Sequence, residues 1–395
     1  MSDVNLQRRV KRHIQAPEHD FFAVTAPGLE DLCAAELANL GAAQTTSLAG
    51  GVAFHGRLEA MLQANLWLRT AGRVLMRLAD FRVRTWADLT RQAAAVPWEL
   101  LLPADGSSLD VRVSLHESNL HHAGRVAEEI FWAAAKAMER QGLTAPVKAL
   151  PGQDDALILQ VRGVDRRASI SLDTSGAHLH KRGYRQATAK APLRETLAAA
   201  LLMLCGYDGS RPLLDPMCGA GTLAIEAALM ARALPPGLGR DFAFQRLAFH
   251  RPAAWAHLQK TAAANALAVP PAPIFAGDRL KSGLELAQAN AARAGVAQSI
   301  QWGQADFFER PAPTATAGLV VINPPYGKRL GSVSQAEQIV RRIGRHLAEH
   351  YRGWRCGVVL YLPQWAELLG LEQIASLEVP HGGLKVTMFC GQVAG

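Results

Sequence analysis

Hydrophobic and polar residues follow two different patterns along this chain of 395 residues. Between residues 20 and 175, short segments that alternate apolar and polar residues, as half-exposed strands do, are separated by amphipathic helical segments. This pattern predicts small α+β modules, which we place at residues 20–70 and 71–175. The predicted strands are residues 21–26, 51–55, 74–83, 109–115, 157–162 and 168–173, and the predicted helices are residues 28–40, 58–67, 86–95 and 123–141.

The second half, residues 192–395, alternates apolar strands with helices in a regular order. Such alternation is typical of a parallel sheet covered by helices, so this half is predicted to be an α/β domain. An insertion at residues 234–273 carries one further helix, residues 253–266. The predicted strands are residues 212–215, 272–276, 299–302, 318–322, 356–362, 374–379 and 384–390, and the main helices are residues 193–204, 222–233, 280–294 and 334–351.

Two segments outside these elements are basic. Residues 1–19 carry a cluster of Lys and Arg and few apolar residues, which favours a solvated tail over an arm that contacts nucleic acid. The linker at residues 176–191 interleaves an aromatic ring with cations, a composition suited to phosphates beside a stackable base. We favour binding over the alternative of a solvated linker. The candidate RNA-binding residues are Lys181, Arg182, Tyr184, Arg185 and Lys190.

A strand, a glycine-containing turn and a helix follow one another in DPMCGAGT, residues 215–222. Glycine lets the backbone approach a ligand closely, and the free N–H groups at the start of a helix favour anionic or polar groups. In an open α/β sheet, ligands bind over the carboxyl ends of the strands. Acidic, amide and aromatic residues occupy three further strand ends, namely Asp278, Asp306 with Phe307, and Asn323 to Tyr326.

These strand ends match the requirements of S-adenosylmethionine. The glycine turn can hold the methionine part, Asp278 can accept from both ribose hydroxyls, and Asp306 can accept from the adenine amine while Phe307 covers its ring. The predicted cofactor-binding residues are Asp215, Pro216, Cys218, Gly219, Gly221, Thr222, Asp278, Asp306, Phe307 and Asn323.

The motif Asn323-Pro324-Pro325-Tyr326 suits methyl transfer to an amino group on a planar base. The Asn323 side-chain oxygen and the Pro324 carbonyl can accept from the NH₂ group and aim its lone pair at a methyl donor. Pro325 stiffens the turn, and Tyr326 can stack on an extruded base. Because alignment contributes most of such a transfer, these four residues are the predicted catalytic residues.

Composition narrows the class of protein. The formal charge of +8 and the isoelectric point near 9.5 favour a polyanionic partner. Five widely spaced cysteines without a C-x-x-C pair predict reduced thiols and no zinc site. No apolar run reaches about 18 residues, and the charged N-terminus is unlike a signal peptide. We therefore expect a cytoplasmic protein without a membrane span or a metal.

A nicotinamide enzyme is the main alternative for the glycine turn, because Gly219-x-Gly221-x-x-Ala224 also fits the loose dinucleotide fingerprint. That fingerprint expects an acid about 20 residues after its first glycine, whereas Asp278 lies much further along the chain. An Asp at the end of the first strand, Asp215, is also unfavourable beside a pyrophosphate. We therefore favour the methyltransferase.

With DPMCGAGT and INPPYGKRL, the sequence resembles the class I (Rossmann-like) methyltransferases that modify amino groups of nucleic acid. More narrowly, it resembles the THUMP-containing RNA guanine-N2 methyltransferases, and most of all the L group that acts on large-subunit ribosomal RNA. The segments TAPGLEDLCAAEL, GGVAFHG, ESNLHHAGRVAEEI, LDTSGAHLHKRGYR and APLRETLAAALL extend the resemblance from about residue 20 to the catalytic half.

This resemblance implies a ferredoxin-like module at residues 20–70, a THUMP domain at residues 71–175 and a seven-stranded catalytic domain at residues 192–395. It implies formation of N2-methylguanine in 23S ribosomal RNA or a large-subunit assembly intermediate. The family often has a second acid where this chain has Leu280, which affects how the ribose is held. Fused members continue into a second methyltransferase domain. Because this chain ends at Gly395, guanine-N7 methylation is not expected.

Three alternatives share parts of this pattern. A transfer-RNA guanine-N2 methyltransferase has the same architecture. A DNA adenine-N6 methyltransferase uses the same Asn-Pro-Pro-Tyr chemistry, although the upstream modules favour RNA. A non-catalytic RNA-binding or ribosome-assembly protein with a vestigial methyltransferase fold is the alternative from another class, and cofactor binding distinguishes it.

Overall fold

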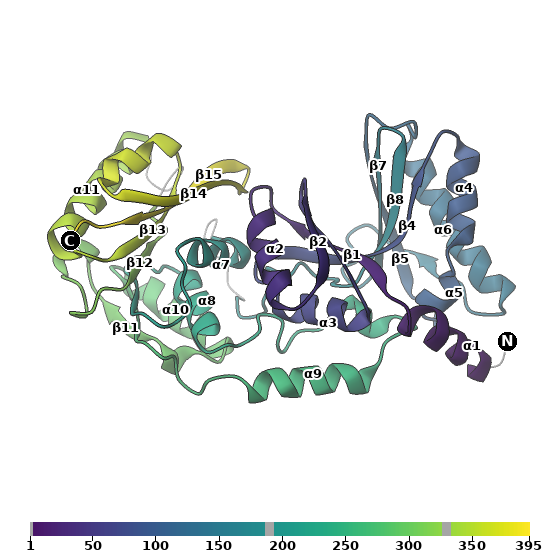
Figure 1. The fold of residues 1–395 in the computed structure, drawn as a ribbon, viewed down its shortest axis with the longest axis horizontal. Helices are drawn as coiled ribbons and strands as arrows, with labels where there is room; N and C mark the ends of the chain where they lie inside the picture. Colours follow the sequence, from purple (N-terminus) through teal and green to yellow (C-terminus); the bar gives the residue numbers. More distant parts are fainter. Residues whose placement is uncertain (1–2, 186–192, 326–332) are drawn as a thin grey trace.

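Two β-sheets organise the protein (Figure 1). The computed structural model describes residues 3–185, 193–325 and 333–395. The strands of the first sheet lie within residues 19–173, and those of the second lie within residues 213–392. The sheets correspond to the two halves that the hydrophobic pattern predicts.

The N-terminal sheet has eight strands in the order β2-β3-β1-β4-β8-β7-β5-β6. Its central strand β4 (Ala71–Arg82) pairs with β1 (His19–Thr25) near its start and with β8 (Arg167–Asp173) toward its end. The two predicted modules therefore share one continuous sheet, and the predicted boundary at residue 70 falls where the shared strand begins. The remaining strands are β2 (Ala43–Leu48), which the hydrophobic pattern did not predict, β3 (Gly51–Gly56), β5 (Ser108–His116), β6 (Val147–Lys148) and β7 (Leu157–Val164).

Helices cover one face of this sheet. Because side chains alternate across a strand, Val74 and Met76 of β4 point into the core beneath the helices, while Leu75 and Arg77 point to the other face. The covering helices are α2 (Glu30–Asn39), α3 (Leu58–Trp67), α4 (Trp86–Ala95), α5 (Trp98–Leu101) and α6 (Ala123–Arg140).

The second sheet has seven strands in the order β11-β10-β9-β12-β13-β15-β14. The first five are parallel, and β15 is antiparallel to β13. This order confirms the predicted seven-stranded Rossmann-like domain. Its strands are β9 (Leu213–Asp215), β10 (Ile274–Asp278), β11 (Gln301–Gln304), β12 (Leu319–Ile322), β13 (Arg355–Leu360), β14 (Glu372–His381) and β15 (Leu384–Gln392).

Helices cover both faces of the second sheet. Helices α7 (Glu195–Leu204), α8 (Thr222–Ala231) and α10 (Lys281–Arg293) pack on one face, and α11 (Val333–His350) packs on the other. Among the described helices, none combines the length and the apolar character that a membrane span requires.

The two halves share their cores. Phe244 and Trp255, from the insertion that contains α9 (Pro252–Ala264), are buried in the core of the N-terminal sheet. Conversely, Leu29 is buried in the core of the catalytic sheet. Next to it, Gly28 has a φ of +92°, and a Cβ there would lie 2.5 Å from the Glu378 carbonyl oxygen of β14. The predicted domain boundary at residue 192 therefore separates segments of sequence but not separate cores.

The prediction of a solvated N-terminal tail is wrong. Asp3–Val10 form helix α1, and the next turn, Lys11–Gln15, continues it. Val10 and Ile14 lie one turn apart and are buried, and the Arg9 guanidinium contacts the Glu99 carboxylate at 2.5 Å. The few apolar residues of this segment are spaced so that one helix face meets the core, and the cations occupy the rest.

Candidate active site

The glycine turn lies where the sequence predicts it, between the end of β9 and the start of α8. Gly219 and Gly221 have φ values of +50° and +80°, which favour glycine. A Cβ at Gly221 would lie 2.9 Å from the Ala287 Cβ of α10, so glycine is needed there for packing. A Cβ at Gly219 would meet no heavy atom within 4 Å, so space for a ligand remains beside Gly219.

Neighbouring elements hold this turn by hydrogen bonds. The Gly219 N–H donates to Asp278 Oδ2 at 2.9 Å, and the Cys218 N–H donates to the Gly277 carbonyl at 2.9 Å. The other Asp278 oxygen accepts from the Leu280 N–H at 2.8 Å. A carboxylate offers about four acceptor positions, so Asp278 keeps capacity for the ribose hydroxyls that the sequence assigns to it.

Asn290 also positions the turn, and the sequence analysis did not identify it. Its side chain lies in α10, is fully buried and donates to the Ala220 carbonyl at 2.9 Å. Arg293 in turn donates to Asn290 Oδ1. Asn290 and Arg293 are three residues apart and therefore lie on the same face of the helix. This spacing was the available sequence signal, because polar groups on a buried helix face need hydrogen-bond partners.

Asp215 ends β9 with a carboxyl group that is 1% exposed. Neither carboxylate oxygen has a partner with good hydrogen-bond geometry among the described residues, although the Ala224 and Met217 N–H groups interact weakly with it. Burial raises the pKa of Asp215 to about 8, and the nearby Asp278 carboxylate adds to this rise. A buried acid without a partner favours a positively charged or hydrogen-bond-donating ligand.

Asn323 reaches the same edge of the sheet. Strand β12 pairs with β9 in parallel register, with Val320 opposite Leu214, so the residue after β12 lies beside the turn after β9. The Asn323 Oδ1 atom is buried and has no hydrogen-bond partner among the described residues. Pro324 and Pro325 follow it directly, whereas Tyr326 lies outside the described residues.

The two candidate adenine contacts differ in their accessibility. Asp306 Oδ1 accepts from the Phe308 N–H at 3.0 Å and so caps the short turn that follows β11. Phe307 is buried, and its ring packs edge-on against His346 with 4.7 Å between centroids. The ring also lines a hollow of about 340 Å³ together with Pro216 and Gly277, so the stacking role of Phe307 stays a prediction.

Two of the predicted RNA-binding residues, Arg182 and Tyr184, do not lie at the surface. Arg182 and Tyr184 are buried, and both contact the Glu226 carboxylate of α8, at 3.5 Å from Arg182 Nε and 3.2 Å from Tyr184 Oη. Arg182 also donates to the Arg69 carbonyl at 2.7 Å, and Arg69 donates to the Leu234 carbonyl at 2.7 Å. Buried polar groups need partners, and this cluster forms a polar junction between the two halves.

Arg185 connects the junction to the glycine turn. Its Nη2 atom donates to the Thr222 hydroxyl at 2.6 Å and lies 3.6 Å from the Glu195 carboxylate. The predicted cofactor residue Thr222 therefore already has a partner in the linker. Lys181 remains exposed, and Lys190 lies outside the described residues.

Two further kinds of chemistry concern this site, a cysteine nucleophile and a metal ion. Burial raises the pKa of the Cys218 thiol, so this cysteine stays protonated and lines the site without acting as a nucleophile. Within residues 3–185, 193–325 and 333–395, no group of three or more His, Cys, Asp or Glu side chains could hold a metal ion.

Comparison with known protein families agrees with this geometry. A model described as the RMKL-like methyltransferase domain matches residues 182–389, more than half of the chain. The chain belongs to the RMKL-like methyltransferase family. A second model, described as the RlmL ferredoxin-like domain, matches residues 20–75 of this RMKL-like methyltransferase. That match extends into β4, beyond the predicted boundary at residue 70.

Curated relatives cover most of the chain. A ribosomal RNA large subunit methyltransferase K/L of Syntrophotalea carbinolica is 35% identical over 95% of this chain and 53% of its own length. The K/L protein of Vibrio campbellii is 34% identical over 93% and 52%. A putative RNA methyltransferase of Synechocystis sp. is 31% identical over 94% of this chain and 96% of its own length. The chain thus spans about half the length of the K/L relatives.

Solved structures share the whole fold. A putative methyltransferase complexed with SAH has a TM-score of 0.84 and 26% identity, covering 96% of this chain and 98% of its own. A predicted N6-adenine-specific DNA methylase from Listeria monocytogenes has a TM-score of 0.82 and 28% identity, covering 100% and 99%.

S-adenosylmethionine is therefore the cofactor of this RMKL-like methyltransferase. The site fits such a ligand on its own observations. Among the described residues, none fills the space beside Gly219 and none is a strong partner of the Asp215 carboxyl group. Gly219, Asp215 and Asp278 would hold it.

Proposed function

We propose that this protein transfers a methyl group from S-adenosylmethionine to the N2 amine of a guanine in large-subunit ribosomal RNA. The observation that supports the chemistry best is the buried Asn323 Oδ1 atom beside the glycine turn, which has no partner among the described residues. An acceptor in that state lacks a hydrogen-bond donor, and an exocyclic amine of a base supplies one.

The chain's own residues bind and orient the amine. Asn323 Oδ1 and the Pro324 carbonyl oxygen accept its two N–H groups, which leaves the nitrogen lone pair directed out of the base plane. Pro325 limits the flexibility of this turn. S-adenosylmethionine, when bound, supplies the electrophilic methyl group. Because no side chain has to remove a proton first, the contribution of the site is mainly alignment.

The ribosomal substrate rests on the relatives. The two K/L proteins are ribosomal RNA large subunit methyltransferases, and the Synechocystis relative is a putative RNA methyltransferase. The formal charge of +8 supports a polyanionic partner. Together with the N-terminal modules, one of which we interpret as a THUMP domain, these points favour structured RNA, naked or in an assembling particle.

Adenine-N6 methylation is the second candidate, because the similar Listeria structure is a predicted N6-adenine-specific DNA methylase. Asn323 and Pro324 would accept from an adenine amine in the same way. Radiolabelled methyl transfer to total unmodified RNA and to DNA, followed by size separation and nucleoside analysis, distinguishes the candidates. N2-methylguanine in large ribosomal RNA is the expected product. Label in transfer RNA would change the substrate, and label in DNA adenine would replace the proposal.

Substitution of Asn323 tests the role of the site. Asn323→Ala is expected to lower the rate of methyl transfer by about 10²-fold or more, because an aligning acceptor is lost. The affinity for S-adenosylmethionine, measured by calorimetry, is expected to change little. Asn265→Ala, at an exposed position after α9, is the matched control. An Asn323→Ala variant that methylates at the parent rate would contradict this role.

A further inference from the structure

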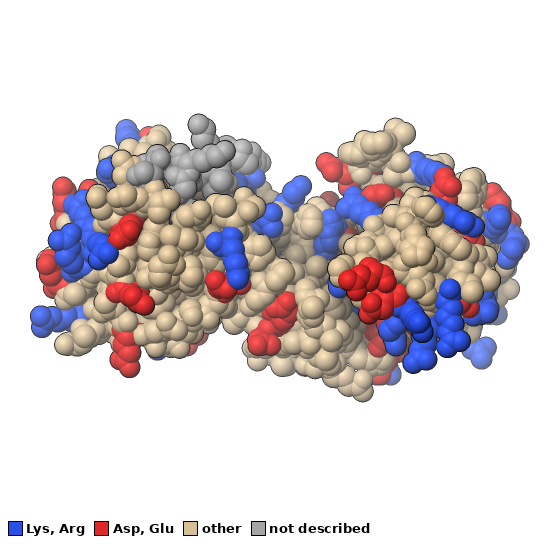
Figure 2. Space-filling view, turned by 90° about the horizontal axis from the view of Figure 1, so that it is seen from above, with Lys and Arg blue, Asp and Glu red and all other residues tan. Residues whose placement is uncertain are grey.

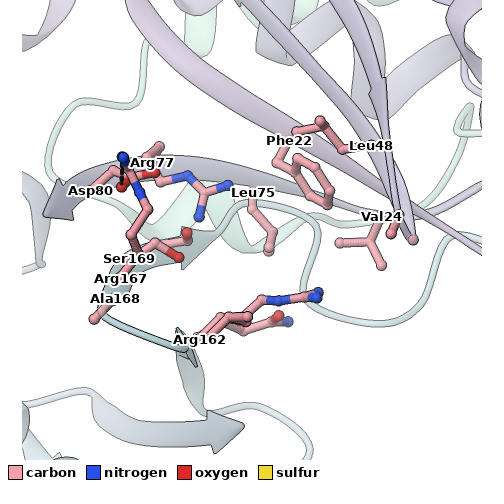
Figure 3. Close-up of a pocket in the computed structure, with 15 residues that line it drawn as sticks. Phe22, Val24, Leu48, Leu75, Arg77, Asp80, Arg162, Arg167, Ala168 and Ser169 are labelled. Atoms are coloured by element: carbon pink, nitrogen blue, oxygen red, sulfur yellow. Dashed lines mark hydrogen bonds and ion pairs between the residues drawn. The ribbon is translucent and has the colours of Figure 1, made fainter. Parts of the chain in front are cut away.

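The face of the N-terminal sheet that the helices leave open contains a hollow of about 350 Å³ (Figure 3). Residues of β1, β4, β7 and β8 line it, and the turn between β2 and β3 forms one side. Its volume lies within the range of small-ligand sites, about 300–1,000 Å³. In Figure 1, the ends of β7 and β8 stand apart from β2.

The surface of the hollow combines apolar and cationic groups. Phe22, Val24 and Leu75 form an apolar patch, and the Arg77 guanidinium lies over the Phe22 ring, 5.5 Å from its centroid. Arg162 extends into the hollow from β7, across from this pair (Figure 3). The site thus presents a half-exposed aromatic ring beside two guanidinium groups.

The charges at this site are not balanced. In the part of the chain that the structure describes, neither Arg77 nor Arg162 has an ion pair or a hydrogen bond to an acid. Asp80, which also lines the hollow, is paired with Arg167 at 2.6 Å. Burial lowers the pKa of Arg77, and the Asp80 and Asp20 carboxylates offset only part of this effect. An anion in the hollow would compensate both guanidinium groups.

A basic track continues beyond the hollow. A second hollow shares Val164 and Arg167 with the first. Its other lining residues are three arginines and one acid, namely Arg82, Arg84, Arg166 and Asp165. Seen from above, several Lys and Arg side chains lie around the indentation near the middle of the molecule (Figure 2). A track of several cations suits a polymer of phosphates better than a single small anion.

The chemistry favours an unpaired strand. A duplex offers phosphates but hides the faces of its bases, so the apolar patch around Phe22 would have no partner. An unpaired nucleotide can place a base against Phe22 and Arg77 while its phosphates meet Arg162 and Arg167. Because every base has a π-face, such a site tolerates different sequences.

We propose that the open face of the N-terminal sheet is a binding site for a single-stranded segment of RNA, with Phe22 and Arg77 holding a base and Arg162 and Arg167 holding the adjacent phosphates. This proposal rests on the proposed function, because it assigns the RNA of that reaction to a surface remote from the catalytic turn. The site holds an unpaired segment of the substrate while a guanine elsewhere occupies the catalytic site.

Fluorescence anisotropy with the full chain tests the proposal. The probes are a labelled unstructured RNA of about 12 nucleotides, a size within the range that such sites cover, and an RNA duplex of equal length. Wild-type protein is expected to prefer the single strand. In R77Q/R162Q, Kd for the single strand is expected to rise about tenfold or more, because a cation at the base and a phosphate contact are both lost. The slope of log K against log salt is expected to fall by about 0.7, as for the one phosphate contact of Arg162. In F22A, Kd is expected to rise about fivefold or more.

The control is R91Q/R140Q, which removes two exposed cations from α4 and α6 on the other face of the same sheet. Its Kd is expected to remain close to that of the wild type. Equal losses in R77Q/R162Q and in the control, no effect of F22A, or wild-type preference for the duplex would each overturn the proposal. Melting temperatures of all variants confirm that they are folded.

Methyl transfer to ribosomal RNA separates this proposal from the proposed function. The R77Q/R162Q variant is expected to raise KM while kcat at saturating RNA is retained. If wild-type protein methylates no RNA, the proposed function is wrong. The anisotropy measurements with oligonucleotides would still test the binding site independently. A lower kcat with an unchanged KM would overturn a role in substrate capture.

Discussion

Two groups of arginines in this protein have the same chemistry and opposite surroundings. In the junction between the halves, Arg182 is buried and contacts the Glu226 carboxylate. On the open face of the N-terminal sheet, Arg162 is exposed and has no acidic partner among the described residues. Both belong to the basic run between Arg162 and Arg194. Their positions in sequence do not distinguish them.

The difference shows that the presence of an acidic partner distinguishes an arginine that stabilises the fold from one that can bind a ligand. A buried ion pair is retained by the fold because each charge needs the other, whereas an unpaired cation at a surface remains available to an external anion. A signal for the junction was present in α8. Glu226 is the acidic residue in the apolar segment TLAIEAALMA, and a glutamate inside a buried helix requires a donor or a cation nearby.

Removing the junction cation is expected to have the largest effect. Arg182→Ala leaves Glu226 buried without its cation, which typically costs about 3–5 kcal/mol of unfolding free energy. The measurement is urea unfolding followed by circular dichroism. The double variant Arg182→Met/Glu226→Leu, which removes both charges while filling similar volume, is expected to recover most of that loss. A folded Arg182→Ala variant of unchanged stability but weakened RNA binding would return Arg182 to the predicted RNA-binding residues.

The catalytic edge of the sheet was predictable because it depends on local rules. A strand, a glycine turn and a helix in DPMCGAGT, and a strand before Asn323, place residues at the carboxyl ends of parallel strands whatever the rest of the fold does. The residues that fix this edge from a distance were not predictable. Asn290 and Arg185 reach the turn only through tertiary packing. The spacing of Asn290 and Arg293 indicates a polar helix face, but neither segment indicates that the glycine turn is its partner.

The missed elements have a similar cause. Strand β2, with the sequence AQTTSL, lies at the edge of its sheet and is mostly exposed, so it shows no apolar alternation. In α1 and the turn that continues it, only the spacing of Val10 and Ile14 indicates a buried face. The insertion was assigned to the catalytic half by its position, yet Phe244 and Trp255 complete the other core. Contacts between residues distant in sequence therefore determine the elements and packing that the local hydrophobic pattern does not predict.

The next prediction compares two buried acids, one of which has a cationic partner. Glu226 has one in Arg182, whereas Asp215 has none among the described residues, and burial raises the pKa of Asp215 to about 8. The folded, ligand-free protein then keeps a proton that the unfolded chain releases above its ordinary value of 3.8. Its unfolding free energy is therefore expected to fall as pH rises from about 4 to 8.

Asp215→Asn isolates this effect, because asparagine resembles the protonated carboxyl group. Between pH 6 and 8, wild-type protein is expected to lose up to about 2 kcal/mol more unfolding free energy than the variant. Cofactor binding gives a second measurement, since S-adenosylmethionine carries positive charge. Its affinity, measured by calorimetry, is expected to rise with pH in the wild type and to stay flat in Asp215→Asn. Parallel pH profiles for the two proteins would show that Asp215 is ionised throughout this range.

The smallest expected effect concerns the stability of the open face. Arg162→Gln removes an exposed cation without an acidic partner, and substitutions of this kind usually change stability by less than about 0.5 kcal/mol. Urea unfolding of Arg162→Gln and of the Arg182 variants compares the contribution of each arginine to the free energy of unfolding. A loss of several kcal/mol at Arg162 would mean that it supports the sheet as Arg182 supports the junction. A negligible loss together with weaker RNA binding would show that the fold retains Arg162 for a ligand, because it contributes nothing to holding the sheet together.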